Sequence, residues 1–217
     1  MLYALFVLIA AAAVFGGMVL LKPFLGEGKT LIQFFRTREM LILYALGTAA
    51  CIAAAECRLV YSKGNFQSAL LNTLCMAMLF AMAISDAKLM RIPNSLCLVG
   101  LGIALIKPIA YLVLAPDQIL AGLLAMLVGA AFAGGVFLLC TLIKPGCVGM
   151  GDVKMFGIIG LLYGLDRSFV LVFFSLIFML IVGVVLMLFK KANRKTELPM
   201  APYAAASCFL AMILGVI

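Results

Sequence analysis

The 217-residue sequence contains no histidine and no tryptophan, and only eight of its residues are acidic. The absence of histidine excludes a Ser-His-Asp triad, a Cys-His pair and an HExxH zinc site. Seven cysteines are present, but no two are spaced as a CxxC pair, and most lie within apolar segments. Cysteine in such segments is commonly a small apolar side chain. The sequence therefore predicts neither a metal site nor a disulfide framework, and we expect no cofactor.

Charged residues are also scarce, at 11% of the chain, whereas hydrophobic residues make up 67% and the mean hydropathy is +1.31. A soluble domain is closer to about half apolar and about a quarter charged. The apolar runs are continuous rather than alternating, which favours membrane helices over a membrane β-barrel. We therefore expect an all-α, polytopic integral membrane protein with about eight transmembrane helices, forming a single membrane-embedded domain over residues 1–217.

Short polar segments divide the apolar sequence into eight expected spans. They are Leu2–Leu21, Met40–Ala55, Ser68–Ile84, Ser95–Leu114, Gln118–Ile143, Asp152–Leu165, Ser168–Phe189 and Met200–Ile217. The first lacks the basic start of a signal peptide and is kept as a span. Asp166-Arg167 is expected to form the turn between the sixth and seventh spans. Lys107 lies inside the fourth span, where an ionisable residue is a functional candidate.

The net charge of +8 predicts an orientation in the membrane rather than nucleic-acid binding, because the basic residues cluster between apolar runs. Twelve of the sixteen Lys and Arg residues follow the odd-numbered spans: Lys22, Lys29, Arg36, Arg38, Lys88, Arg91, Lys144, Lys154, Lys190, Lys191, Arg194 and Lys195. The other four are Arg58, Lys63, Lys107 and Arg167. We expect a multi-pass protein of the cell membrane, embedded in the lipid bilayer, with odd-numbered loops cytoplasmic, both termini external and no nucleic-acid partner.

Two of the eight acidic residues are expected at the same face of the membrane. Asp86 follows the third span and Asp152 begins the sixth, so the charge-derived topology places both at the cytoplasmic edge. Gly149 and Gly151 stand just before Asp152, where glycine permits a backbone approach that a side chain would block. Two carboxylates that share a proton can act as general base and general acid in peptide hydrolysis. That chemistry requires neither histidine nor a metal.

Other interpretations of the two aspartates stay open. Asp152 can cap a helix, and Asp86 can pair with Lys88, as ordinary interfacial carboxylates do. A small ion- or proton-coupled membrane transporter that uses Asp86 and Asp152 is the alternative function, and a non-catalytic assembly factor of a secretion apparatus is another. A transporter favours charged groups near the membrane midplane. Because both aspartates are expected at one edge, the sequence favours a protease.

Three motifs occur in order between Ser85 and Tyr203. They are Ser85-Asp86-Ala87-Lys88 with Ile92-Pro93-Asn94, then Gly149-Met150-Gly151-Asp152-Val153-Lys154, then Pro199-Met200-Ala201-Pro202-Tyr203. Together they resemble the motifs of the prepilin peptidases, or type IV leader peptidases, which are GxGD-type membrane aspartic proteases. The resemblance extends from about Leu71 to the C-terminus. One departure is Pro-Met-Ala-Pro, which stands where the family usually has Pro-Phe-x-Pro.

The resemblance implies that Asp86 and Asp152 are the catalytic pair. It also implies a set of substrate-binding residues, namely Gly149, Gly151, Lys154, Pro93 and Asn94. The implied substrates are prepilins or pilin-like precursors with a class III leader, a short basic peptide cut at the cytoplasmic face before an apolar helix. Larger bacterial members carry an insertion with two CxxC pairs and an N-methyltransferase activity. Without a CxxC pair, this sequence resembles the short form, associated with tight-adherence (Flp-type) pili or archaeal-type preflagellin processing.

Overall fold

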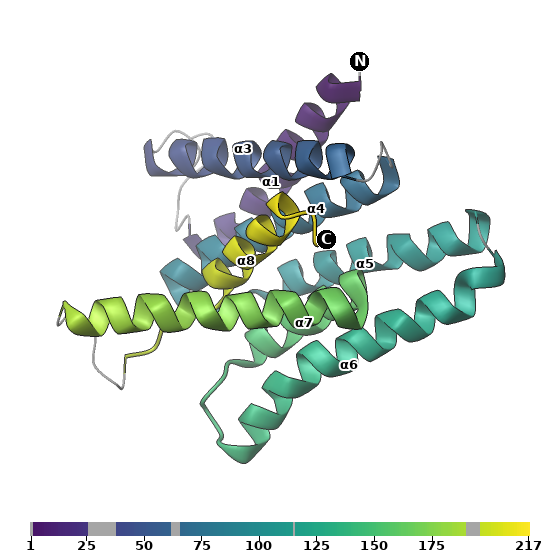
Figure 1. The fold of residues 1–217 in the computed structure, drawn as a ribbon. Coiled ribbons are helices and arrows are strands. Elements are labelled where there is room, and N and C mark those ends of the chain that lie inside the picture. Colours follow the sequence, from purple (N-terminus) through teal and green to yellow (C-terminus); the bar gives the residue numbers. More distant parts are fainter. Residues whose placement is uncertain (1, 26–37, 62–65, 115, 190–195) are drawn as a thin grey trace.

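The computed structural model describes residues 2–25, 38–61, 66–114, 116–189 and 196–217, and every regular element in these ranges is helical (Figure 1). The helices are α1 (Leu2–Leu25), α3 (Arg38–Tyr61), α4 (Phe66–Leu89), α5 (Asn94–Leu114), the short 3-10 helix η1 (Pro116–Gln118), α6 (Ile119–Ile143), α7 (Met150–Leu188) and α8 (Ala201–Ile213). Much of each expected loop at Lys22–Glu39, Tyr61–Gln67 and Lys190–Pro199 lies outside the described residues.

Among the described residues, five stretches of helix are long and apolar enough to cross a membrane. They lie in α1, α4, α5, η1 with α6, and α7. The helices α3 and α8 contribute the shorter apolar segments Leu41–Ala53 and Ala201–Ile213. At 39 residues, α7 has nearly twice the length of about 20 residues that one crossing needs. The prediction of an all-α, multi-pass membrane protein is confirmed at this level.

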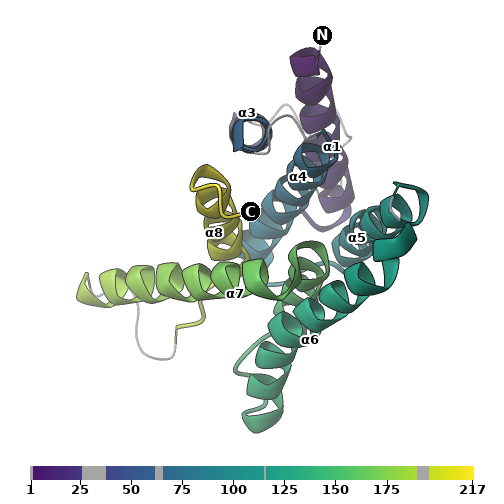
Figure 2. The same cartoon turned by 45° about the vertical axis from the view of Figure 1, so that its right-hand side comes forward.

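The central helix is α4, which contacts α1, α3, α5 and α8. Figure 2 shows α8 between α4 and α7. Small residues allow close packing around α4: a Cβ atom on Gly17 of α1 would lie 2.9 Å from the Cβ of Ala81. Such packing holds helices together in lipid, where apolar side chains gain nothing from leaving the solvent. Asp86 is thus carried by a helix with neighbours on several sides.

The long helix α7 is bent at Gly164, which has φ +74° and ψ −175°. Essentially only glycine adopts this backbone region without strain. The expected turn at Asp166-Arg167 is therefore wrong, because both residues are helical and the chain changes direction two residues earlier. The bend divides α7 into limbs 150–163 and 165–188, which correspond to the sixth and seventh expected spans (Figure 1).

Lys107 of α5 stabilises this bend. Its Nζ donates a hydrogen bond of 3.0 Å to the carbonyl oxygen of Leu162. A bend interrupts the regular hydrogen bonds of a helix and leaves carbonyl groups in need of other donors. In a membrane such a group is costly unless the protein itself supplies the partner.

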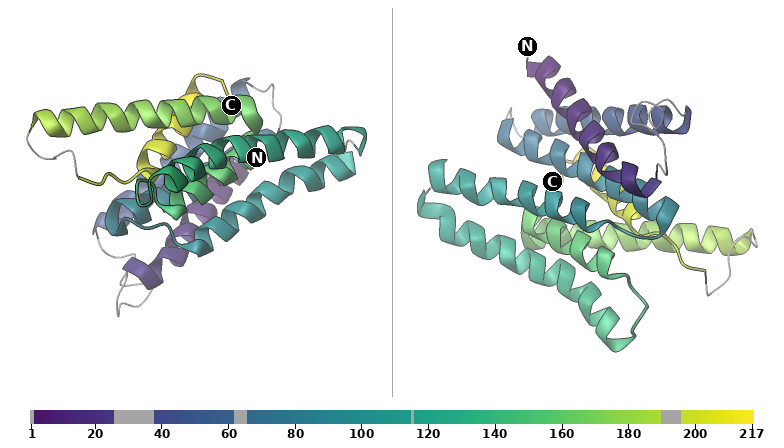
Figure 3. Two further views of the ribbon diagram at one scale, coloured as in Figure 1. Left: turned by 90° about the horizontal axis from the view of Figure 1, so that it is seen from below. Right: turned by 180° about the vertical axis from the view of Figure 1, so that it is seen from behind.

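The backbones of α6 and α7 touch at three glycines. A Cβ atom on Gly129 of α6 would lie 2.6 Å from the carbonyl carbon of Gly164 and still closer to the carbonyl oxygen of Gly160. A Cβ atom on Gly160 would in turn overlap the backbone of Gly129. Figure 3 shows α6 running beside the first limb of α7, the limb that carries Asp152. This contact therefore fixes the position of that limb.

Candidate active site

Asp86 and Asp152 are brought together by the ends of two helices. Asp86 stands on the last turn of α4, and Asp152 stands on the first turn of α7. The charge of Asp86 acts directly on the carboxyl group of Asp152, so the two side chains lie within electrostatic range of each other. Neither lies in the middle of its helix. We expected Asp86 and Asp152 at the same end of the molecule, and their positions at the end of α4 and the start of α7 agree with that expectation.

Asp86 is buried, with 6% of its surface exposed, and is held by the start of α8. Its Oδ2 accepts a hydrogen bond of 2.9 Å from the backbone N–H of Ala201, the first residue of that helix. The positive end of a helix dipole favours a negative charge at this position. Ala201 belongs to the Pro-Met-Ala-Pro motif but was not among the predicted site residues. The Pro-Met-Ala-Pro motif was the sequence signal that could have identified Ala201. Its backbone N–H orients the carboxyl group of Asp86.

The polypeptide that follows Asp86 forms a tight connection to α5. Ser85 Oγ donates a hydrogen bond of 2.8 Å to the carbonyl oxygen of Arg91. Met90 adopts a left-handed conformation with φ 53°, which few residues other than glycine adopt. Pro93 is buried, and its carbonyl oxygen accepts a bond of 3.1 Å from the N–H of Leu96. The helix α5 therefore starts directly after Pro93, at Asn94.

Asp152 is fixed by the residue that precedes α7. Gly149 is extended, with φ −70° and ψ 141°, and its carbonyl oxygen accepts a bond of 3.0 Å from the N–H of Asp152. The backbone N–H of Gly149 also acts on the Asp152 carboxyl group, but Gly149 has no side chain to return a hydrogen bond, so the arrangement is not a capping box. Asp152 lies in the first turn of α7, whose N-cap residue is Gly149. Its Oδ1 is buried and has no partner among the described residues, which leaves that oxygen for a water molecule or a shared proton.

Two contacts join the start of α7 to the connection between α4 and α5. A Cβ atom on Gly151 would lie 3.0 Å from the Cβ of Ile92, so the absence of a side chain lets these segments meet. Lys154 Nζ donates a hydrogen bond of 2.9 Å to Asn94 Oδ1. Four of the predicted substrate-binding residues therefore lie around the two aspartates: Gly149, Gly151, Lys154 and Asn94. Their contact with substrate stays a prediction.

A cavity of about 650 Å³ opens at the connection between α4 and α5. One lining residue comes from the end of α1, and the others come from a short segment around the α4–α5 connection. They are Phe24, Leu89, Arg91, Ile92, Pro93, Asn94 and Ser95. Pro93 and Asn94, two predicted substrate-binding residues, thus form part of its wall. The cavity gives a peptide room beside the segment that carries Asp86.

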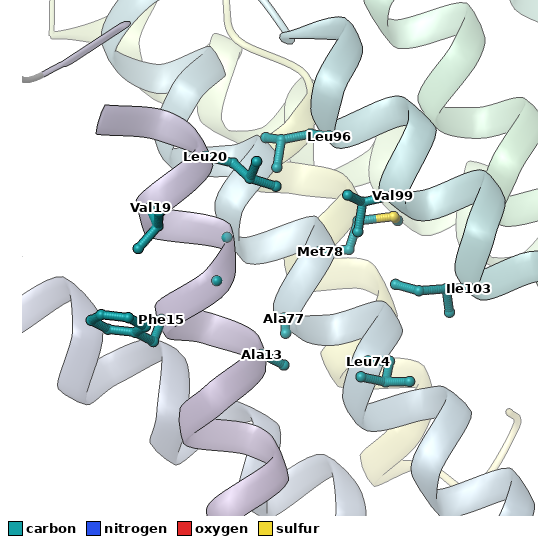
Figure 4. Close-up of a pocket in the computed structure, with 12 residues that line it drawn as sticks. Ala13, Phe15, Val19, Leu20, Leu74, Ala77, Met78, Leu96, Val99 and Ile103 are labelled. Carbon is teal, nitrogen blue, oxygen red and sulfur yellow. The ribbon is translucent and has the colours of Figure 1, made fainter. Parts of the chain in front are cut away.

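An apolar cavity of about 560 Å³ lies between α1, α4 and α5 (Figure 4). Leu74 and Met78 of α4 line it together with Val99 and Ile103 of α5. None of the described residues that line this cavity is charged, so they offer apolar surface but no group that can activate water.

Lys88 does not serve as the partner of Asp86. Its Nζ lies 3.4 Å from Oε2 of Glu39, in an exposed ion pair between α4 and α3. An exposed pair of this kind contributes only about 0–1 kcal/mol to stability. The alternative that pairs Asp86 with Lys88 is therefore wrong. Within the described ranges, no group of three or more Cys, Asp or Glu residues is placed to hold a metal ion.

The chain is similar to a prepilin leader peptidase/N-methyltransferase of Bacillus subtilis (strain 168), with 33% identity over 175 residues. The similarity covers 78% of this chain and 64% of the relative, so the chain spans less than two thirds of the relative's length. No solved structure matches the chain. Residues 73–184, which carry both Asp86 and Asp152, match the type IV leader peptidase family. Since this match covers more than half of the 217 residues, the chain belongs to the type IV leader peptidase family.

Proposed function

We propose that this chain is a membrane aspartic endopeptidase, which removes the basic leader peptide from prepilin or pilin-like precursors at the cytoplasmic face of the membrane. The observation that carries the proposal is the approach of Asp86 and Asp152 at one end of the helices. Membership of the leader peptidase family supports the reaction, and the name of the Bacillus subtilis relative supports the class of substrate. We place the active site in a single membrane-embedded domain over residues 1–217.

In the proposed mechanism a water molecule lies between the two carboxyl groups. Asp86, which accepts a hydrogen bond from the start of α8, is the ionised partner and removes a proton from the water. The oxygen of that water attacks the carbonyl carbon of the scissile bond. Asp152 carries the shared proton and donates it to the carbonyl oxygen. When the tetrahedral intermediate collapses, the C–N bond breaks and the proton held by Asp86 passes to the leaving amine. One hydroxyl group of the intermediate returns its proton to Asp152.

The substrate is proposed to approach through the cavity beside the α4–α5 connection. Pro93 and Asn94 line that cavity, and Lys154 is bound to Asn94. Gly149 and Gly151, just before Asp152, carry no side chains. We propose that these five residues contact the extended peptide around the scissile bond. The precursor's apolar helix stays in the surrounding lipid.

The proposed topology has eight crossings, both termini outside and the active-site end in the cytoplasm. It predicts opposite labelling at the two ends of α6. In a cysteine-free background, Lys144→Cys should react with a membrane-impermeant thiol reagent only after the cytoplasmic side is opened. Asp117→Cys should react in intact cells. Both positions are exposed on the protein surface, so a difference in labelling reports the side of the membrane and not burial within the protein. Reaction of Lys144→Cys in intact cells would place the proposed active site outside.

The proposed reaction is tested by co-expression with a pilin-like precursor that carries a basic leader, a glycine and an apolar helix. We expect a shorter product that appears only when this chain is present, detected by immunoblot. A matched precursor in which the leader and its glycine are deleted should keep its size. If the full precursor also keeps its size in membranes that contain the chain, the proposed reaction is wrong.

The proposed chemistry uses only carboxyl groups and water, so cleavage should survive strong chelation. This expectation rests on the absence of histidine and of CxxC pairs from the sequence. Purified protein incubated with EDTA should cleave at the rate of untreated protein, and elemental analysis should find no stoichiometric zinc. Loss of activity in EDTA followed by recovery with zinc would contradict the aspartic mechanism.

A further inference from the structure

A small polar cavity of about 50 Å³ lies at the bend of α7, away from the two aspartates. It is lined by side chains and backbone of α4, α5 and α7, and these residues are Ser68, Leu71, Asn72, Lys107, Leu162, Tyr163 and Arg167. Asn72 and Asp86 both belong to α4 and are fourteen residues apart. At about 1.5 Å per residue, that separation is roughly 21 Å. The cavity is therefore separate from the candidate active site around Asp86 and Asp152.

Two cationic side chains share this cavity without an acidic partner. Lys107 is partly buried, and the charge of Arg167 acts directly on it. The ion pair that joins Lys88 to Glu39 is at a different place, and neither Lys107 nor Arg167 pairs with an acidic residue in the described part of the chain. Like charges repel more strongly where water is partly excluded. The pair therefore creates a local positive potential that an anion would neutralise.

Asn72 adds an unpartnered donor to the same cavity. Its side chain is only 5% exposed, and its Oδ1 accepts a hydrogen bond of 3.2 Å from Tyr163 Oη. That bond leaves the amide nitrogen, Nδ2, buried and without a partner among the described atoms. A buried donor in this condition is costly and is rare in native proteins. A bound acceptor would satisfy it.

We propose that this cavity binds a phosphate group. The guanidinium group of Arg167 and the ammonium group of Lys107 supply the charge, and Nδ2 of Asn72 supplies a neutral hydrogen bond. Guanidinium and ammonium groups are well suited to tetrahedral oxyanions. In the proposed topology this end of the helices faces outward, where the head groups of phospholipids lie. A lipid phosphate and free phosphate share the required chemistry.

A bound phosphate would connect three helices at the bend. Asn72 belongs to α4, Lys107 to α5 and Arg167 to the second limb of α7. The anion would remove the repulsion between the two cations while Lys107 continues to hold the carbonyl of Leu162. Binding is therefore expected to raise the stability of the folded protein, since a ligand that binds only the folded state does so.

The test measures the unfolding temperature of the purified chain in dodecylmaltoside micelles. Added dioleoyl phosphatidylglycerol should raise it, whereas dioleoylglycerol, which has the same chains without phosphate, should not. Arg167→Gln should weaken the effect of the phospholipid about tenfold in half-saturating concentration, because one charge-assisted contact is lost. Lys144→Gln removes an exposed charge at the far end of α6 and should respond as the wild type does.

Inorganic phosphate forms the second arm of the experiment. If phosphate alone raises the unfolding temperature and Arg167→Gln weakens that effect, the site takes the free anion, and the proposal stands with that source. If Arg167→Gln responds to both compounds as the wild type does, or the wild type responds to neither, the cavity holds only water and the proposal is wrong. Arg167 takes no part in the hydrogen bond from Lys107 to the carbonyl oxygen of Leu162, so its replacement leaves that contact intact. The assay needs no cleavage and is independent of the peptidase activity.

Discussion

Replacement of either aspartate by asparagine is expected to abolish cleavage of a pilin-like precursor. Asp86→Asn removes the ionised partner and Asp152→Asn removes the proton donor, and each loss should lower the rate by about 10³-fold or more. The double variant should be hardly slower than either single variant, because residues that act as a unit do not contribute additively. The measurement is the initial rate of product formation by purified protein in liposomes.

The controls separate catalysis from folding. Asparagine has nearly the shape of aspartate, so both variants should remain in the membrane at the wild-type level. Asp117→Asn changes an exposed carboxylate in η1 and should cleave at the wild-type rate. If Asp86→Asn cleaves nearly as well as the wild type while Asp152→Asn does not, the paired mechanism fails. Asp86 would then be only an interfacial carboxylate that binds the start of α8.

Gly160→Ala is expected to destabilise the protein by about 2 kcal/mol or more, because overpacking a close contact usually costs about 1–3 kcal/mol. The new Cβ would overlap the backbone of Gly129, and backbone cannot move aside as a flexible side chain can. The two helices must therefore separate, and Asp152 moves with the first limb of α7. We expect a lower unfolding temperature in detergent and a loss of cleavage that exceeds the loss of folded protein.

Gly157→Ala provides the matched control on the same limb. A Cβ atom on Gly157 would meet nothing within 4 Å, so only helix propensity changes. Alanine is favoured over glycine in a helix by about 0.5–1 kcal/mol, which predicts an unchanged or slightly higher unfolding temperature. Equal unfolding temperatures for Gly160→Ala and Gly157→Ala would show that the glycine contact between α6 and α7 does not determine the fold.

The placement of the aspartates could be predicted because it depends on signals that a sequence carries. Apolar runs locate the helices, and the distribution of Lys and Arg assigns their ends to two sides. Asp86 and Asp152 stand at ends assigned to the same side, and the structure brings them together. The fourth span was expected from Ser95, and α5 begins one residue earlier, directly after Pro93.

Other features could not be predicted, for physical reasons. The turn was expected at Asp166-Arg167 because a charged pair is typical of a loop, but the conformation of Gly164 decides where α7 bends. The bond from Ala201 to Asp86 joins residues far apart in sequence, and no local pattern specifies such a contact. Lys88 was an available partner for Asp86, yet it pairs with Glu39, a residue of another helix.

The most direct test of the proposed function is the intact mass of the product that the purified chain forms in liposomes from a pilin-like precursor. The proposal predicts one new species, shorter by the basic leader and starting at the apolar helix. It predicts that this species is absent when Asp152→Asn replaces the wild type. Formation of the same species by Asp152→Asn at the wild-type rate, or no cleavage by the wild type, would contradict the assignment of this chain as an aspartic leader peptidase.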